Sequence, residues 1–177
     1  IAIGTPYDRD KELQNWADEI HNQNLNVWFR SHWGSWDGEE NMPAVMTPQE
    51  SLDKTHKFIV DHPFLFREGD SFTITVEAEE TGIGLGKKFL TWQEYRDYYL
   101  NQIDTANRAF AEIGLEGKVH TNWISVNGWI VNNVFDQELV DKAGLIVVDH
   151  YSPQSSTIGV FDNPEKVASE MSRDLDA

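Results

Sequence analysis

The chain has no cysteine among its 177 residues. This absence excludes disulfide bonds, zinc–thiolate sites, iron–sulfur clusters and cysteine nucleophiles, and it is compatible with any redox compartment. No apolar run reaches the ~18 residues of a transmembrane helix, and no signal peptide is visible. We therefore expect no membrane-spanning segment and no thiol chemistry.

Basic residues are also scarce, because 14 Lys and Arg stand against 30 Asp and Glu, for a net charge of −16. Nucleic acids and anionic membranes are polyanions, so we expect neither as a partner. Neutral and cationic ligands remain compatible with this charge. The acidic composition slightly favours an extracellular or secreted location. The length and the 40% hydrophobic content suit one domain, residues 1–177, with a substantial core.

Strand and helix patterns alternate along the chain. Apolar runs predict strands at residues 1–5, 25–29, 71–76, 119–125 and 145–148. Helical spacing and N-cap patterns predict helices at residues 10–22, 48–61, 91–113, 137–142 and 163–171. Strands separated by helices indicate an α/β fold with a parallel sheet and crossover helices. A complete (β/α) barrel has eight strands and at least ~200 residues, so we expect a partial or truncated TIM-like barrel in an incomplete domain.

A glutamate cluster follows the third predicted strand. Glu77, Glu79 and Glu80 come after the apolar residues 72–76 and precede a loop with Gly82, Gly84 and Gly86. Glu77 and Glu79 share a face while the strand persists, and two close carboxylates tend to raise the pKa of one of them. A carboxyl group with a raised pKa can act as a general acid at neutral pH. The alternative is a solvated acidic turn. The glycine spacing matches no phosphate-binding loop, and we expect no cofactor.

Polar and aromatic residues follow every predicted strand. Because parallel strands end at one edge of a sheet, these residues should share a rim. Aromatic rings stack on the C–H faces of sugars, and planar polar side chains bind sugar hydroxyls. We therefore expect a carbohydrate ligand, whereas Trp16 and Trp92, on helices, are expected in the core. The candidate ligand-binding residues are Tyr7, Arg30, His32, Trp33, Trp36, Glu80, Asn122, Trp123, Asn127, Asp149, His150 and Tyr151.

Several segments resemble the (β/α)8 glycoside hydrolases of the large retaining superfamily, particularly its uncharacterised bacterial members. The resemblance rests on residues 5–10 and 25–30, on residues 58–70 leading into the glutamate strand, and on Asp149-His150-Tyr151 after the run LIVV. It covers most of the chain, and its motifs are short. It implies a glycosidase barrel of which this chain supplies strands two to six.

In that superfamily the fourth strand ends in the acid/base glutamate, usually after an asparagine. Here the matching strand ends in Glu77-Ala78-Glu79-Glu80, without the asparagine. The resemblance therefore implies Glu79 as the first catalytic candidate and Glu77 as the second. The family's nucleophile follows strand seven, which would lie beyond Ala177, so the second carboxylate within this chain would be Asp149, Glu80 or Asp37. An open parallel edge is prone to association, so we expect a second copy or a partner chain to cover it.

Two other functions remain open. One is a partial barrel that binds carbohydrate without hydrolysing it, which Glu79→Gln would distinguish, because only an enzyme would lose turnover. The other is a metal-dependent barrel hydrolase or lyase using His32, Asp37, Glu77, Glu79, Asp149 and His150. No metal-ligand spacing occurs within one element, so we expect no metal, and insensitivity to chelators would remove this function.

Overall fold

A computed structural model describes residues 2–4, 10–31, 47–73, 91–127 and 133–149. The strands are β1 (Ala2–Gly4), β2 (Trp28–Arg30), β3 (Ser71–Thr73), β4 (His120–Asn127) and β5 (Leu145–Asp149). The helices are α1 (Asp10–Asn22), α2 (Pro48–Asp61), the 3-10 turn η1 (Pro63–Leu65), α3 (Trp92–Glu112) and α5 (Gln137–Lys142). The alternation predicted from the sequence is confirmed over these ranges. The expected helix at residues 163–171 and the end of the third predicted strand lie outside them.

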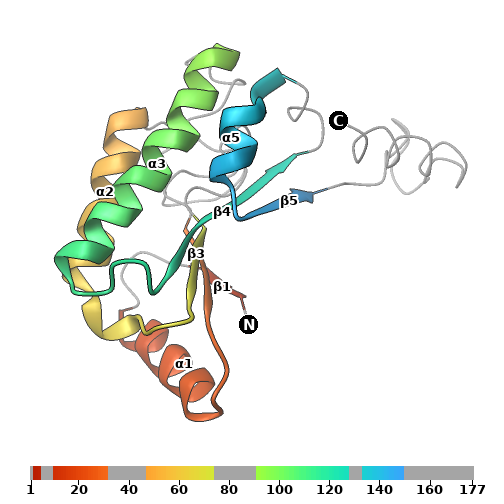
Figure 1. Ribbon diagram of the computed structural model, residues 1–177. Coiled ribbons are helices and arrows are strands. Elements are labelled where there is room, and N and C mark those ends of the chain that lie inside the picture. Colours follow the sequence, from red (N-terminus) through yellow and green to blue (C-terminus); the bar gives the residue numbers. More distant parts are fainter. Residues whose placement is uncertain (1, 5–9, 32–46, 74–90, 128–132, 150–177) are drawn as a thin grey trace, which may run out of the picture.

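The five strands form one parallel sheet in the order β1-β2-β3-β4-β5 (Figure 1). Each strand pairs with the next one in the chain, so the order never reverses as it does in a doubly wound sheet. Right-handed crossovers in such an order place successive helices on the same side of the sheet. This is the arrangement of a (β/α) barrel, and the prediction of a partial barrel with crossover helices is confirmed.

Local sequence signals set the starts of the two longest helices. Thr47 and Thr91 cap α2 and α3, and each hydroxyl accepts a hydrogen bond from the backbone N–H of the glutamate three residues on. Glu50 and Glu94 in turn accept from the backbone N–H of their capping threonine, at 2.7 Å in both helices. These capping boxes satisfy N–H groups that have no partner inside a helix.

One hydrophobic core lies between the helices and one face of the sheet. α2 and α3 stand side by side over this face (Figure 1), and Phe29, Phe72 and Ile124 point into it, each at most 1% exposed. Five phenylalanine rings meet here mostly edge to face, which adds to the free energy of burying them. These rings belong to Phe29, Phe58, Phe66, Phe72 and Phe110.

A buried polar network fixes α2 against α3. Gln102 donates from Nε2 to the hydroxyls of Ser51 and Tyr98, at 3.0 and 2.5 Å. Its Oε1 accepts from the Thr55 hydroxyl at 3.2 Å, and Ser51 and Tyr98 also bond each other at 2.7 Å. All four residues are buried. Because their hydrogen bonds form only in one alignment, the network selects the relative position of the two helices.

Asp70 joins several elements at the amino-terminal end of β3. Its side chain is fully buried and accepts hydrogen bonds from the backbone N–H groups of Val27 and Arg67, at 2.8 and 2.9 Å. His21 Nε2, at the end of α1, lies 3.1 Å from both carboxylate oxygens. The Asp70 carbonyl accepts from His120 N–H at the start of β4. One carboxylate therefore links α1, β2 and β3 at this end of the sheet.

Two predictions about tryptophan burial are wrong. Trp16 is 49% exposed because it flanks the buried stripe of α1, which consists of Leu13, Ala17 and Ile20. Trp92 is 36% exposed because it occupies the first residue of α3, beyond the part of that helix that covers the sheet. No helix in the described part of the chain is both long and apolar enough to cross a membrane.

Candidate functional site

The carboxyl ends of the five strands lie at one edge of the sheet. Strands β2 to β5 end at Arg30, Thr73, Asn127 and Asp149. In the strand register Arg30 pairs with Thr73, and Asn127 pairs with Asp149. The sheet therefore places three predicted ligand-binding residues, Arg30, Asn127 and Asp149, at the strand ends where (β/α) barrels carry their sites.

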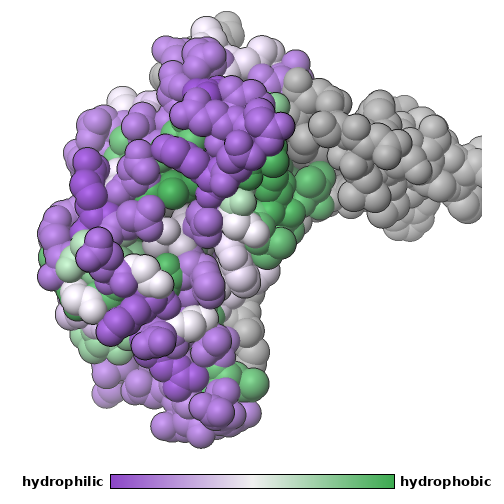
Figure 2. All heavy atoms as spheres, viewed as in Figure 1, coloured by the Kyte–Doolittle hydropathy of each residue, from purple (hydrophilic) through white to green (hydrophobic). Residues whose placement is uncertain are grey.

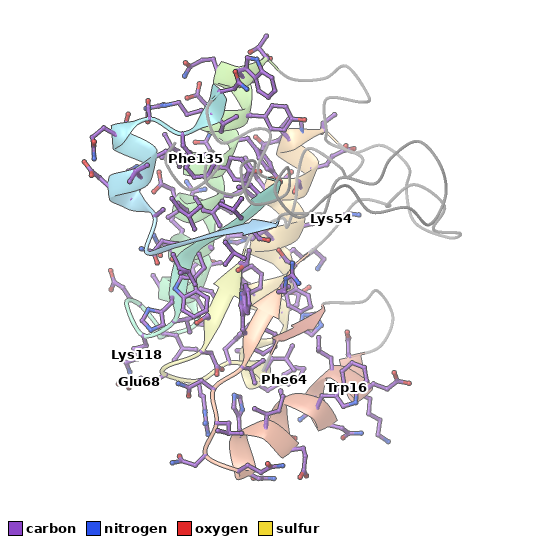
Figure 3. The ribbon with its side chains drawn as sticks, turned by 90° about the vertical axis from the view of Figure 1, so that its right-hand side faces the viewer. Trp16, Lys54, Phe64, Glu68, Lys118 and Phe135 are labelled. Carbon is purple, nitrogen blue, oxygen red and sulfur yellow. The ribbon has the colours of Figure 1, made fainter. Side chains whose placement is uncertain are left out.

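The face of the sheet opposite the core carries aromatic, hydroxyl and basic side chains. We call it the inner face. It is defined by Trp28, Arg30, Ser71, Thr73, Trp123, Ser125, Leu145 and Val147, which alternate along their strands with residues of the core. Figure 3 views the molecule from the side to which this face turns, with the strands in front of α2 and α3.

Trp28, Arg30 and Trp123 form the centre of the inner face. The indole rings of Trp28 and Trp123 meet edge to face, with centroids 5.5 Å apart and an interplanar angle of 74°. The Arg30 guanidinium lies 5.4 Å from the centroid of the Trp28 ring, a cation–π distance. All three side chains are partly exposed. They form an aromatic surface with a fixed positive charge at its strand-end side.

Hydroxyl groups hold this cluster in place. Trp28 Nε1 donates to Thr73 Oγ1 at 2.5 Å, across the β2–β3 pair. Arg30 Nη2 lies 3.5 Å from Ser125 Oγ, at the long limit for a hydrogen bond. Thr73 and Ser125 are fully buried, so their positions are set by the strands. Neighbouring strands therefore contribute to the orientation of both Trp28 and Arg30.

Two of the predicted site residues, Arg30 and Trp123, each lie against the Trp28 ring. Asn127 and Asp149 lie at adjacent strand ends, and their side chains lie outside the described part of the chain. The remaining predicted site residues, apart from Asn122, also lie outside the described residues. They are Tyr7, His32, Trp33, Trp36, Glu77, Glu79, Glu80, His150 and Tyr151.

Asn122 and Trp123 were grouped with the residues at strand ends, but both lie inside the fourth strand, because β4 runs from His120 to Asn127. The β3–β4 register shifts by one residue between His120 and Trp123. Asn122 donates from Nδ2 to the Lys142 carbonyl at 3.1 Å, at the end of α5. Its own carbonyl accepts from Gly144 N–H at 2.8 Å. Asn122 thus connects α5 to β4, and we leave it out of the site.

Sequence reasoning missed Trp28, Thr73 and Ser125 as members of this cluster. Trp28 carried a signal, because it lies two residues before Arg30 and a strand places such residues on one face. Thr73 and Ser125 carried none, since their contacts join residues 45 and 95 positions apart along the chain. Only the register of the sheet brings them to Trp28 and Arg30.

Among the described residues, the carboxyl groups with a shifted pKa lie on or at the ends of helices, away from the inner face. Asp136 caps α5, and its pKa is lowered by hydrogen bonds from the Leu139 backbone N–H and from the Arg96 side chain. The pKa of Glu50 is lowered by its hydrogen bonds to Thr47 in the α2 capping box. These groups stabilise helix ends. Among the described side chains, no three His, Asp or Glu residues come together as a metal site would require.

Comparisons with known proteins find a similar fold among solved structures but no similar sequence. No family model matches the chain, and no curated protein matches it in sequence. A solved structure of a fungal β-1,4-galactanase is similar over 82% of this chain, with a TM-score of 0.53 and 12% identity. The catalytic domain of a mannanase from Streptomyces sp. SirexAA-E is similar over 98% of this chain and 63% of its own, with a TM-score of 0.44 and 10% identity.

These neighbours are TIM-barrel glycoside hydrolases. At 12% identity the galactanase shows the fold and no more. This chain spans half the length of that galactanase, and its described residues form five strands, compared with the eight of a complete barrel.

Proposed function

We propose that this chain is a glycoside-hydrolase-like barrel that binds carbohydrate at the carboxyl ends of its strands. The observation that carries the proposal is the cluster of Trp28, Trp123 and Arg30 on the inner face, at a distance of 5.5 Å between the two indoles. Tryptophan rings stack on the C–H faces of a pyranose, and the guanidinium offers planar donors to its hydroxyls. The similarity to the galactanase fold supports the same class of ligand.

The charge of the molecule favours a neutral sugar over a charged one. At −16 the chain as a whole repels polyanions such as polyuronates. A neutral hexose polymer experiences no such repulsion, and its hydroxyls match the carboxylate and amide groups predicted at the rim. Because the galactanase acts on a β-1,4-galactan, that polymer is the first substrate to test.

For catalysis we propose Glu79 as the general acid/base, with Glu77 as the alternative. Both follow Thr73, the last described residue of β3, at distances along the chain of six and four residues. The acid would protonate the leaving glycosidic oxygen while a second carboxylate, Asp149 or Glu80, attacks the anomeric carbon or activates water. A separation of about 5 to 5.5 Å between the two carboxyl groups would give retention, and about 6.5 to 9.5 Å inversion.

The test is hydrolysis of β-1,4-galactan by the wild-type chain and by Glu79→Gln and Glu77→Gln, followed as released reducing ends. Loss of general acid catalysis should lower kcat about 10²- to 10⁴-fold in one of the two variants, with little change in substrate affinity. Glu68→Gln is the matched control, because Glu68 is an exposed glutamate near the other end of β3 (Figure 3). Equal activity in the wild type and both variants would refute the catalytic assignment.

A second function, carbohydrate binding without hydrolysis, is favoured by one observation. The described side chains of the inner face include two indoles, hydroxyls and a guanidinium, all suited to binding. A wild-type chain that binds galacto-oligosaccharides without cleaving them, at an affinity that Glu79→Gln leaves unchanged, would support this function. It would also remove Glu79 from the site.

We further propose that residues 1–177 belong to one barrel domain that this chain alone does not complete. The described sheet has five strands, and the β/α repeat continues through all of them without a change of direction. Limited proteolysis tests the single domain: the chain should be cut at its loops without releasing two stable fragments. Two fragments that unfold independently would contradict it.

A further inference from the structure

The third strand carries small hydroxyl residues on the inner face, between two strands that carry tryptophans. In the register Trp28 of β2 pairs with Ser71 of β3, and Thr73 of β3 pairs with Trp123 of β4. Neighbouring strands lie about 4.8 Å apart, so strands two apart are separated by about 9.5 Å. The two indole centroids are only 5.5 Å apart. Both rings therefore lean toward each other across β3, where the small side chains of Ser71 and Thr73 leave room for them.

Ring contacts alone do not determine where such a pair of indoles settles. Trp123 meets Trp28 edge to face and stacks on His120, with centroids 6.0 Å apart and an interplanar angle of 14°. On its other side the register pairs Trp123 with Leu145 of β5, which is 40% exposed. Figure 2 shows hydrophobic surface where β5 lies, to the right of the hydrophilic helices. Because apolar contact is not directional, it lets the Trp123 ring lean toward β5 as well as toward β3.

The hydrogen bond from Trp28 to Thr73, by contrast, has a fixed direction. Trp28 Nε1 donates to Thr73 Oγ1 at 2.5 Å, and Thr73 is fully buried. The Thr73 carbonyl accepts from the backbone N–H and from the hydroxyl of Ser31, at 3.0 and 2.9 Å. The backbone of Thr73 is thus held in place, and its hydroxyl is an acceptor at a fixed position. Because a hydrogen bond weakens steeply when it bends, this contact fixes the Trp28 indole, against which the Trp123 ring rests.

We propose that Thr73 is a positioning residue of the proposed sugar site, because its hydroxyl sets the orientation of the two tryptophans that would receive the sugar. This inference rests on the proposed function, and it assigns Thr73 no contact with the sugar itself. A sugar stacks on one face of a ring, so a ring that is already held in that orientation loses less conformational entropy when the ligand binds. The Thr73 hydroxyl therefore contributes to affinity through Trp28.

Calorimetry with galacto-oligosaccharides on the full chain is the first test. Thr73→Val keeps the shape of the side chain and removes the hydroxyl, so binding should weaken about three- to tenfold, as expected for one hydrogen bond. Thr73→Ser keeps the hydroxyl and should bind nearly as the wild type does. Thr121→Val is the matched control, because Thr121 is a buried strand threonine, 4% exposed, whose hydroxyl donates to Asn107 on α3. It should lower the urea midpoint of unfolding as Thr73→Val does, without weakening binding. Wild-type affinity in Thr73→Val, or an equal loss in Thr121→Val, would overturn the proposal.

Circular dichroism tests the positioning itself in the absence of sugar. Two indoles this close couple their electronic transitions, and the resulting far-ultraviolet signal depends on the angle between the rings. Trp28→Phe and Trp123→Phe should each remove that signal and so identify it. Thr73→Val should change the signal and Thr121→Val should not, and an unchanged signal in Thr73→Val would overturn the inference.

The inference and the proposed function can fail separately. Sugar binding that Thr73→Val leaves at wild-type strength would refute the role of Thr73 and leave the sugar site standing. A wild-type chain that binds no neutral oligosaccharide would refute the proposed function, and the dichroism would still decide whether Thr73 orients the two tryptophans.

Discussion

Replacing Asp70 should destabilise the protein more than any other single carboxylate in the described part of the chain. The Asp70 side chain is fully buried and accepts hydrogen bonds from the backbone N–H groups of Val27 and Arg67 and from His21. Asp70→Ala leaves two backbone donors without their acceptor at the junction of α1, β2 and β3. Each unsatisfied buried donor costs about 1 to 3 kcal/mol, so the free energy of unfolding should fall by about 3 to 5 kcal/mol.

Two further variants make this prediction specific. Asp70→Asn keeps one oxygen acceptor, so it should lower the free energy of unfolding about half as much as Asp70→Ala does. Asp104→Ala is the control, because Asp104 is an exposed carboxylate on α3, 3.9 Å from Lys142, and it should cost less than about 0.5 kcal/mol. Urea unfolding at neutral pH, followed by circular dichroism, measures all three. An Asp70→Ala variant within about 1 kcal/mol of the wild type would refute the argument.

Three more predictions concern other parts of the fold. Gln102→Leu removes the partner of three buried hydroxyls between α2 and α3 and should lower the free energy of unfolding by about 2 to 4 kcal/mol; a loss below 1 kcal/mol would count against a specifying network. Gly69→Ala should lower the Tm more than Gly117→Ala. Both glycines have a positive φ, but only a Cβ at residue 69 would meet the Asn26 side chain, at 2.8 Å. An equal loss of Tm in the two variants would show that the Asn26 side chain moves away without cost. The pKa of Asp136 is lowered in the folded protein, so the ionised carboxylate stabilises the fold at neutral pH, and this stabilisation is lost as the pH falls through the lowered pKa, below the ordinary 3.8. Asp136→Asn should therefore reduce the fall of Tm at acid pH. An unchanged fall of Tm would contradict this.

The sequence predicted what local interactions determine. The helix start at Thr47 was predicted correctly because its capping box involves residues only three apart. The second strand was expected at residues 25–29, but it is Trp28–Arg30. The reason lies far along the chain, since Arg67 binds the Leu25 carbonyl and Asp70 binds Val27 N–H. These contacts occupy the Leu25 carbonyl and the Val27 N–H, and no pattern near residue 25 reveals them.

The same distinction between local and long-range interactions applies to the candidate site. Arg30 became a candidate because it follows the apolar run at residues 25–29, and its place at the end of β2 depends on neighbouring residues. The contact of Trp28 with Trp123 depends on the sheet order and on the one-residue register shift between β3 and β4. Asn122 looked like a ligand by residue type alone, but the same register places it against Lys142. Residue type indicated the class of chemistry, whereas register decided which residues meet.

The most direct test of the carbohydrate site is the affinity of the full chain for galacto-oligosaccharides, measured by calorimetry for the wild type, Trp123→Ala and Trp16→Ala. Both replaced residues are tryptophans with exposed surface. Trp123 lies on the inner face, whereas Trp16 lies on α1 (Figure 3). Loss of the stacking ring should weaken binding about tenfold, or about 1.4 kcal/mol, in Trp123→Ala and leave Trp16→Ala unchanged. Equal affinities for all three proteins, or no binding by the wild type to any neutral oligosaccharide, would contradict the assignment of this face as a sugar site.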